Sequence, residues 1–138
     1  MRQREPVFVD SGAWIALALS RDPLHGRARE QWDVLRGAGA RLHTSIPVMI
    51  ETFTFLDRNA NRDVALTWKE SISELGTLKI LPCELVDLER SWEYFRRSDL
   101  HQLSAVDATS FAIMKRARIR IAYTFDHHFA GVGFRLVG

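Results

Sequence analysis

The sequence contains very little cysteine and no long run of apolar residues. Cys83 is the one cysteine among 138 residues, which excludes an internal disulfide and a thiolate metal cluster. The longest uncharged apolar stretch, residues 13–19, is too short to cross a bilayer, which takes about 20 residues. The amino terminus is charged, but Asp10 interrupts the apolar segment that follows, so the pattern differs from that of a signal peptide. We therefore expect a cytoplasmic protein without a membrane anchor.

Several motifs of common enzyme classes are also missing. The side chains of the adjacent His127 and His128 are expected to diverge, and neither HExxH nor a Cys/His pattern surrounds them, which argues against zinc. No GxxxxGK[ST] phosphate-binding loop occurs, and the glycines of residues 37–39 follow a helical pattern instead of a strand. A contact of His128 or His25 with phosphate is left open.

The composition is that of an ordinary globular protein, with 46% apolar and 26% charged residues. This length fits a single domain over residues 1–138, and no repeat or low-complexity tract divides it. The formal net charge is only +2, but 16 of the 19 basic residues are arginine, whose planar side chain binds phosphate with two donors. A nucleic-acid partner and a general arginine bias of the genome explain this composition equally well.

Short apolar runs alternate with amphipathic segments along the chain. Residues 7–9 are apolar without alternation, which is typical of a strand buried on both faces. The alternation predicts an α/β fold with a parallel sheet covered on both faces, and it leaves the strand order open. Strands are expected at residues 7–9, 42–45, 78–81, 119–124 and 134–137, with helices between them. We expect the four tryptophans to be core or interface anchors: Trp14, Trp32, Trp68 and Trp92.

Four acidic residues stand in comparable settings, although they lie far apart in the sequence. Asp10 and Asp126 each end an apolar run, whereas Glu51 and Asp107 lie near the beginning of helical segments. Because the carboxyl ends of parallel strands meet at one edge of a sheet, these side chains are expected to gather there. Four carboxylates at one place would repel one another unless a cation lay between them. The pattern therefore predicts a Mg²⁺ or Mn²⁺ site and phosphate chemistry.

Each of these acids also has a structural explanation. Asp10 has the position of a helix cap, and Asp126 that of a turn aspartate. Glu51 lies in an apolar helix, where a single acid commonly faces solvent. Asp107 follows Ser104 by three residues, which approximates a capping box. Only the four acids together favour a metal site over these separate roles.

The order and context of these segments resemble the PIN-domain ribonucleases, in particular the VapC-type toxins of toxin–antitoxin pairs. The resemblance spans essentially the whole chain, and it rests on residues 7–13, residues 44–45 leading to Glu51, and residues 103–110, 123–129 and 131–136. It implies a three-layer α/β/α sandwich with a parallel sheet in strand order 3-2-1-4-5.

The resemblance also implies roles for individual residues. Metal binding and catalysis would fall to Asp10, Glu51, Asp107 and Asp126. Thr124 and Ser11 match supporting hydroxyl positions, and Asp99 lies where some members carry an additional acid. By position, Asp99 is equally suited to pair with a neighbouring arginine at the surface. Arg21 and Arg97 are candidates for holding flanking phosphates.

The resulting hypothesis is a Mg²⁺- or Mn²⁺-dependent endoribonuclease that acts as a toxin and is restrained by a small antitoxin protein. Apolar surface around Trp14, Phe53, Phe55 and Trp68 is expected to receive the antitoxin or a second copy of the chain, and core packing is the alternative role of these residues. Two alternatives stay open. One is a PIN-like RNA-processing nuclease without a toxin role, and the other is a non-catalytic module that binds RNA or protein on the same fold.

Overall fold

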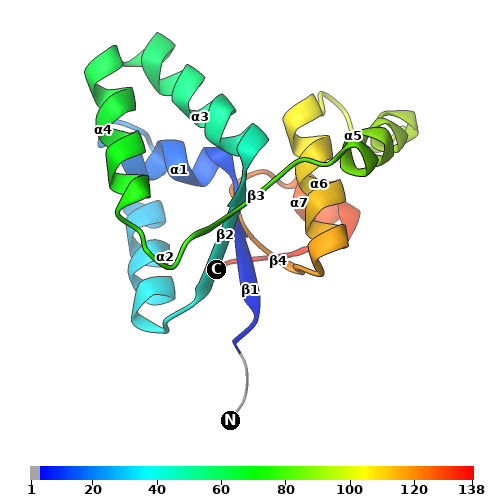
Figure 1. Ribbon diagram of the computed structural model, residues 1–138, viewed down its shortest axis with the longest axis horizontal. Coiled ribbons are helices and arrows are strands. Elements are labelled where there is room, and N and C mark those ends of the chain that lie inside the picture. Colours follow the sequence, from blue (N-terminus) through cyan, green and yellow to red (C-terminus); the bar gives the residue numbers. More distant parts are fainter. Residues whose placement is uncertain (1–3) are drawn as a thin grey trace.

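The computed structural model describes residues 4–138 and contains a five-stranded sheet (Figure 1). All neighbouring strands are parallel, and their order is β3-β2-β1-β4-β5. This confirms the strand order that the sequence resemblance implied. The strands are β1 (Pro6–Val9), β2 (Arg41–Ser45), β3 (Lys79–Leu81), β4 (Ile121–Tyr123) and β5 (Arg135–Leu136).

Helices cover both faces of the sheet and form the outer layers of an α/β/α sandwich. In Figure 1 the first four helices lie on one side of the strands, and the last three α-helices lie on the other. The helices are α1 (Ser11–Ala18), α2 (His25–Gly37), α3 (Ile46–Asn59), α4 (Arg62–Ser73), α5 (Leu85–Ser91), the 3₁₀ helix η1 (Trp92–Arg96), α6 (Ala105–Ala117) and α7 (His128–Val132). Within residues 4–138, none of them has the length and apolar character needed to span a membrane.

The central strand β1 is the most deeply buried part of the sheet. Phe8 and Val9 are fully buried, because β1 lies between β2 and β4 and has helices over both faces. A strand buried on both faces needs no polar alternation, which explains its continuous apolar sequence. Val7 lies beside Leu42 of β2 and Ile121 of β4, so the register brings the carboxyl ends of these three strands to one edge.

The beginnings of α3 and α6 are fixed at that same edge by capping hydroxyls. Ser45, the last residue of β2, accepts a hydrogen bond from the Val48 amide at 3.2 Å. Ser104 accepts one from the Asp107 amide at 3.0 Å, which is one half of the capping box that the sequence suggested. Because each cap satisfies a free amide of the first turn, it determines where the helix starts. The first turns of α3 and α6 are thereby placed next to the end of β1.

The tryptophans differ in their environments. Trp14 and Trp68 are buried, and Trp32 is half-buried, so these three are anchors as expected. Trp92 is 46% exposed, so it is not a core anchor, and the helix expected through residue 95 gives way at Trp92 to the 3₁₀ helix η1. α5 itself is held to α6 by the fully buried Asp87, which accepts two hydrogen bonds from Arg116 at 2.8 and 2.9 Å.

Candidate active site

The four acids predicted from the sequence converge at the carboxyl edge of the central strands. Asp10 follows β1 directly, Asp126 lies three residues beyond β4, Glu51 belongs to α3, and Asp107 lies in the first turn of α6. Asp10 and Asp107 are only 3% and 9% exposed, and the other two are half-buried. The charges of Glu51 and Asp126 act on Asp10, and those of all three others act on Asp107.

Asp10 is the most buried member of the cluster. Its Oδ2 accepts a hydrogen bond from Thr124 Oγ1 at 2.9 Å, whereas Oδ1 is buried without a hydrogen-bond partner among residues 4–138. Burial, with smaller contributions from Glu51 and Asp126, raises the pKa of Asp10 to about 6. Although Asp10 stands at the N-cap position of α1, its side chain makes no capping hydrogen bond. The interpretation of Asp10 as a simple helix cap is therefore wrong.

Asp107 and Asp126 form a hydrogen-bonded pair of carboxyl groups. Burial first, then the charge of Asp10 and the hydrogen bond to Asp126, raise the pKa of Asp107 above its usual range. Burial acts in the same direction on Asp126, but hydrogen bonds from the His128 amide, from Asp107 and from the His128 side chain outweigh it and lower the pKa of Asp126. The opposed directions of the two pKa shifts follow from the closeness of the two carboxyl groups, since ionisation of one disfavours ionisation of the other.

His128 is a member of this arrangement that the sequence reasoning treated only as a phosphate contact. Its Nδ1 lies 2.8 Å from Asp126 Oδ1, and its amide donates to the same oxygen at 2.9 Å. Its Nε2 lies 2.8 Å from the carbonyl oxygen of His101. Asp107, Asp126 and His128 can each offer a ligand atom within 4.8 Å of the others. The one sequence feature that could have predicted this contact is the position of His128 two residues after Asp126, which follows a strand.

Two hydroxyl groups orient the remaining acids. Ser11 Oγ donates to Glu51 Oε1 at 2.5 Å, which directs the Glu51 side chain of α3 toward the end of β1. Thr124 donates to Asp10 and accepts from the Asp126 amide at 3.0 Å, so it joins the two strand-end acids. The alternative for Glu51 taken alone, a position on a solvent-facing stripe, is therefore not the arrangement found.

Asp99 forms a separate interaction. It is exposed and accepts two hydrogen bonds from Arg97, at 3.0 and 2.7 Å, while Arg97 also donates to the carbonyl oxygen of Gly131 at 3.2 Å. The hydrogen bonds from Arg97 lower the pKa of Asp99. Arg97, one of the two arginines suggested as phosphate ligands, thus already has an acidic partner. The other, Arg21, is exposed in the turn after α1.

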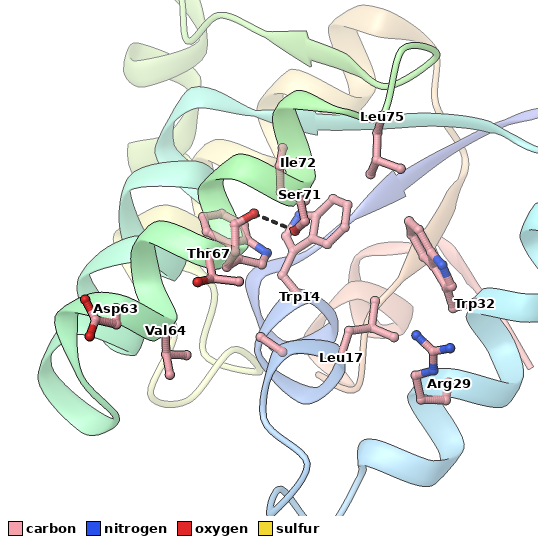
Figure 2. A pocket seen from close by; sticks show the side chains of 12 residues that line it. Trp14, Leu17, Arg29, Trp32, Asp63, Val64, Thr67, Ser71, Ile72 and Leu75 are labelled. Carbon is pink, nitrogen blue, oxygen red and sulfur yellow. Dashed lines mark hydrogen bonds between the residues drawn. The ribbon is translucent and has the colours of Figure 1, made fainter.

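An apolar cleft of about 530 Å³ lies between α1, α2 and α4 (Figure 2). Trp14 and Leu17 of α1, Trp32 of α2, and Trp68 and Ile72 of α4 line it. Arg29 and Asp63 are the charged residues of its lining, and Figure 2 shows them on different helices. Because α1 begins at the residue after Asp10, the cleft and the acidic cluster share this helix.

The apolar surface predicted around Trp14, Phe53, Phe55 and Trp68 is divided between two places. Trp14 and Trp68 belong to the cleft, whereas Phe55 is 40% exposed on α3 and lines a separate groove with Ile50 and Glu51. Phe53 is half-buried and packs against the core. The four residues thus do not form one surface, since successive residues of α3 point in different directions around the helix.

Comparison with protein families places this arrangement in context. The model of the PIN domain matches residues 7–135. The chain belongs to the PIN-domain family. A relative of this PIN domain, the 23S rRNA-specific endonuclease VapC20 of Mycobacterium tuberculosis, is 36% identical over 129 residues, which cover 93% of this chain and 95% of the relative.

Solved structures agree with this assignment. The crystal structure of Mycobacterium tuberculosis VapC20, described as a Sarcin-Ricin loop cleaving toxin, matches with a TM-score of 0.80 at 32% identity, covering 93% of this chain and 95% of that one. VapBC2 from Rickettsia felis, bound to a DNA fragment from its promoter, matches with a TM-score of 0.71 at 10% identity over 95% and 96% of the chains. FitAcB from Neisseria gonorrhoeae matches with a TM-score of 0.70 at 14% identity, covering 96% of both chains. The last two show a common fold.

Proposed function

We propose that this PIN domain is a divalent-metal-dependent endoribonuclease and the toxin of a type II toxin–antitoxin pair. The observation that supports it most is the convergence of four carboxylates, one of which, Asp10, has a buried Oδ1 without a hydrogen-bond partner among residues 4–138. A buried carboxylate oxygen without a donor is unfavourable unless a cation or another donor approaches it. The endonuclease relative at 36% identity over nearly the whole chain supports the same conclusion.

The residues present fit a hard divalent cation. Carboxylate oxygens are the ligands that Mg²⁺ and Mn²⁺ prefer, and the cluster offers them from two helices, α3 and α6, and from the residues that follow β1 and β4. Asp10, Asp107 and Asp126 would hold the ion, and Glu51 would serve as a further ligand or as the base. When bound, the metal supplies a water of lowered pKa and stabilises charge on the phosphate.

The chain's own groups have distinct tasks in this proposal. Glu51, fixed by Ser11, accepts the proton of the attacking water, because a general base must be held within hydrogen-bond reach. Thr124 keeps Asp10 and Asp126 at a fixed separation. His128 orients Asp126 through two contacts to the same oxygen, so the carboxylate keeps its second oxygen for the metal.

The experiment that tests this function is cleavage of total RNA by the purified protein in the presence of Mn²⁺, with mapping of the cut ends. The Asp10→Asn protein should lose cleavage, whereas Asp99→Asn should retain it, because Asp99 pairs with Arg97 at the surface. Cleavage retained by a well-purified Asp10→Asn protein would contradict the assigned site. Absence of both cleavage and metal-dependent stabilisation in the unmutated protein would favour a non-catalytic binding module.

We further propose ribosomal RNA as the substrate class, because the relative named above is specific for 23S rRNA. Intact ribosomes should then be cut at one or a few positions, which primer extension along 23S rRNA would locate. Cuts confined to precursor RNAs would instead favour an RNA-processing nuclease. A short reading frame directly before the gene would support the toxin role.

The proposed antitoxin partner would occupy the apolar cleft between α1, α2 and α4. The cleft combines aromatic and aliphatic walls with Arg29 and Asp63, the composition of a site for an amphipathic segment. From there a basic side chain of the partner could reach the acids, since α1 leads directly from the cleft to Asp10 and Ser11. A homodimer through this surface is the alternative, and the mass of the isolated chain in solution distinguishes the two.

A further inference from the structure

The edge of the sheet opposite to the four acids is basic. Arg41, Lys79 and Arg135 are the first residues of β2, β3 and β5. Arg4 and Arg120 lie shortly before β1 and β4, and all five are exposed. Every strand therefore has a cation at its amino end. In Figure 1 this edge lies toward the end of the chain marked N.

Four cations of this region surround one pocket of about 610 Å³: Arg4, Arg36, Arg41 and Lys79. The pocket exists because the chain turns sharply from α2 into β2. Gly39 has a φ of +65°, which suits glycine, and the Ala40 amide donates to the Leu35 carbonyl oxygen at 2.9 Å. This turn brings Arg36, in the last turn of α2, to the same pocket as Arg41.

The four cations have no acidic partner in the part of the chain that the structure describes. The pocket lining contains neither Asp nor Glu, and within residues 4–138 none of the four side chains lies in an ion pair. Their hydrogen bonds go to neutral groups, since Arg4 donates to the Gly39 carbonyl and Arg41 to the Arg4 carbonyl, both at 3.3 Å. Burial first, and then the charges of Arg41 and Lys79, lower the pKa of His43 in the pocket wall. The pocket is therefore a place of uncompensated positive potential.

Compensation of the helix dipole explains only part of this arrangement. Arg36 in the last turn of α2 and Arg4 on the Gly39 carbonyl both lie where cations stabilise a helix end. Arg41 and Lys79 begin strands, and the dipoles of strands are small. Neither of these two charges is therefore explained by a helix end, and neither has an acidic partner within residues 4–138, which points to an external anion.

We infer that this pocket, with Arg4, Arg36, Arg41 and Lys79, binds backbone phosphates of folded RNA as a second contact remote from the acids. The inference rests on the proposed function, in which RNA is the substrate. The guanidinium group of arginine can donate two parallel hydrogen bonds to the oxygens of one phosphate. RNA presents several phosphates within the width of one pocket. The five residues of β2 alone span about 16 Å between the two edges, so a folded RNA, not a short strand, is expected to touch both.

The test compares two double variants in the cleavage-deficient Asp10→Asn protein. One is Arg41→Ala with Lys79→Ala in the pocket. The matched control is Lys69→Ala with Arg90→Ala, which removes the same charge from exposed positions on α4 and α5. Binding of folded ribosomal RNA and of a short single-stranded oligonucleotide is measured over a range of salt concentrations, and circular dichroism verifies the fold of each variant.

We expect the pocket variant to bind folded RNA on the order of tenfold more weakly at low salt, with a salt slope reduced by about 1.4 to 1.8 for two lost phosphate contacts. The control variant and the binding of the short oligonucleotide should stay unchanged. Equal effects of the pocket and control variants would overturn the inference, because net charge alone would then explain them. Polyglutamate that binds the unmutated protein but not the pocket variant, while both proteins bind RNA equally well, would also overturn it. That result would indicate an acidic protein partner.

Cleavage is measured separately in proteins that retain Asp10. Absence of cleavage by the unmutated protein, together with the expected loss of RNA binding in the pocket variant, would reject the nuclease and support the RNA contact. Cleavage of folded RNA at the normal rate by the pocket variant, with unaltered affinity, would reject the contact and support the nuclease.

Discussion

Thr124 is the residue that joins the two strand-end acids, because its hydroxyl donates to Asp10 and accepts from the Asp126 amide. Thr124→Val keeps the shape of the side chain and removes both hydrogen bonds. Loss of a group that orients metal ligands commonly weakens metal affinity by roughly 10- to 100-fold, and we expect a change of that size. Titration of Mn²⁺ followed by calorimetry measures it.

The matched control is Thr109→Val in α6. Thr109 is also buried, but its hydroxyl donates to the Val106 carbonyl oxygen of its own helix. Equal metal affinity of the Thr124→Val and Thr109→Val proteins would show that Thr124 does not orient the acids.

Asp10 should make the stability of the metal-free protein depend on pH. Its folded-state pKa of about 6 lies above the 3.8 of an unperturbed aspartate, so the folded protein favours the protonated form. The protonated Asp10 therefore contributes its full stabilisation below about pH 4. This contribution to the free energy of unfolding, about 3 kcal/mol in total, is lost as the pH rises through about 6. In the presence of a chelator, Asp10→Asn should raise the free energy of unfolding by about this amount at pH 7 and by little at pH 4.

Urea unfolding at both pH values measures this difference. Asp99→Asn again serves as the control, since Asp99 is exposed beside Arg97. A gain in stability for Asp10→Asn that is the same at both pH values would exclude ionisation of Asp10 as its cause.

The sequence was sufficient to predict where the acids lie, because Asp10 and Asp126 follow apolar strands whose carboxyl ends meet in a parallel sheet. It was not sufficient for the contacts between them. The hydrogen bond from Ser11 to Glu51 joins side chains 40 positions apart, and the orientation of His128 depends on the turn after β4. Such contacts follow from packing, which no local pattern encodes. The roles of these residues as metal ligands and catalysts stay predictions.

Helix α1 connects the apolar cleft to the acids, and the cleft offers a test of the proposed antitoxin site. Thr67 of α4 lines the cleft (Figure 2). Thr67→Trp should fill part of this space and weaken binding of an antitoxin by at least about tenfold, since steric exclusion from a central pocket removes well-packed contacts. RNA cleavage should be retained, because Thr67 makes no contact with the acids.

The corresponding control is Ser73→Trp, an exposed position at the end of the same helix outside the cleft. Co-purification with the product of the preceding short reading frame measures the partner's affinity. Loss of the partner in both variants, or in neither, would place its binding site elsewhere.

At the level of elements, alternating apolar runs predicted the parallel sheet, and the family resemblance predicted its order. Both are confirmed. The change from α5 to η1 at Trp92 was not foreseen, because Leu85, Leu88, Trp92 and Phe95 keep helical spacing through it. Periodicity records which side of a segment is apolar, and it does not distinguish an α-helix from a short 3₁₀ turn that continues it.

For the whole molecule, a bound divalent ion should raise stability, because it neutralises repulsion among groups that the fold holds together. At a Mg²⁺ concentration of about 100 times its dissociation constant, the gain should be about 2.7 kcal/mol. Thermal unfolding with and without Mg²⁺ measures this as a shift of several degrees in Tm.

The shift should disappear in Asp10→Asn and persist in Asp99→Asn. A similar shift in both variants would indicate that Mg²⁺ binds at another place. Because thermal unfolding needs no substrate, this result is independent of any RNA target. The single domain over residues 1–138 and the cytoplasmic location also stay predictions.

The separation of charge across the sheet gives the molecule a permanent electric dipole moment. A polyanion approaching from solution would be attracted to the arginine-rich end and repelled by the carboxylate end. Metal loading would diminish this asymmetry, so cation concentration would govern which end first meets a nucleic acid. Encounter rates should therefore respond to divalent ions in a way that simple salt screening does not reproduce.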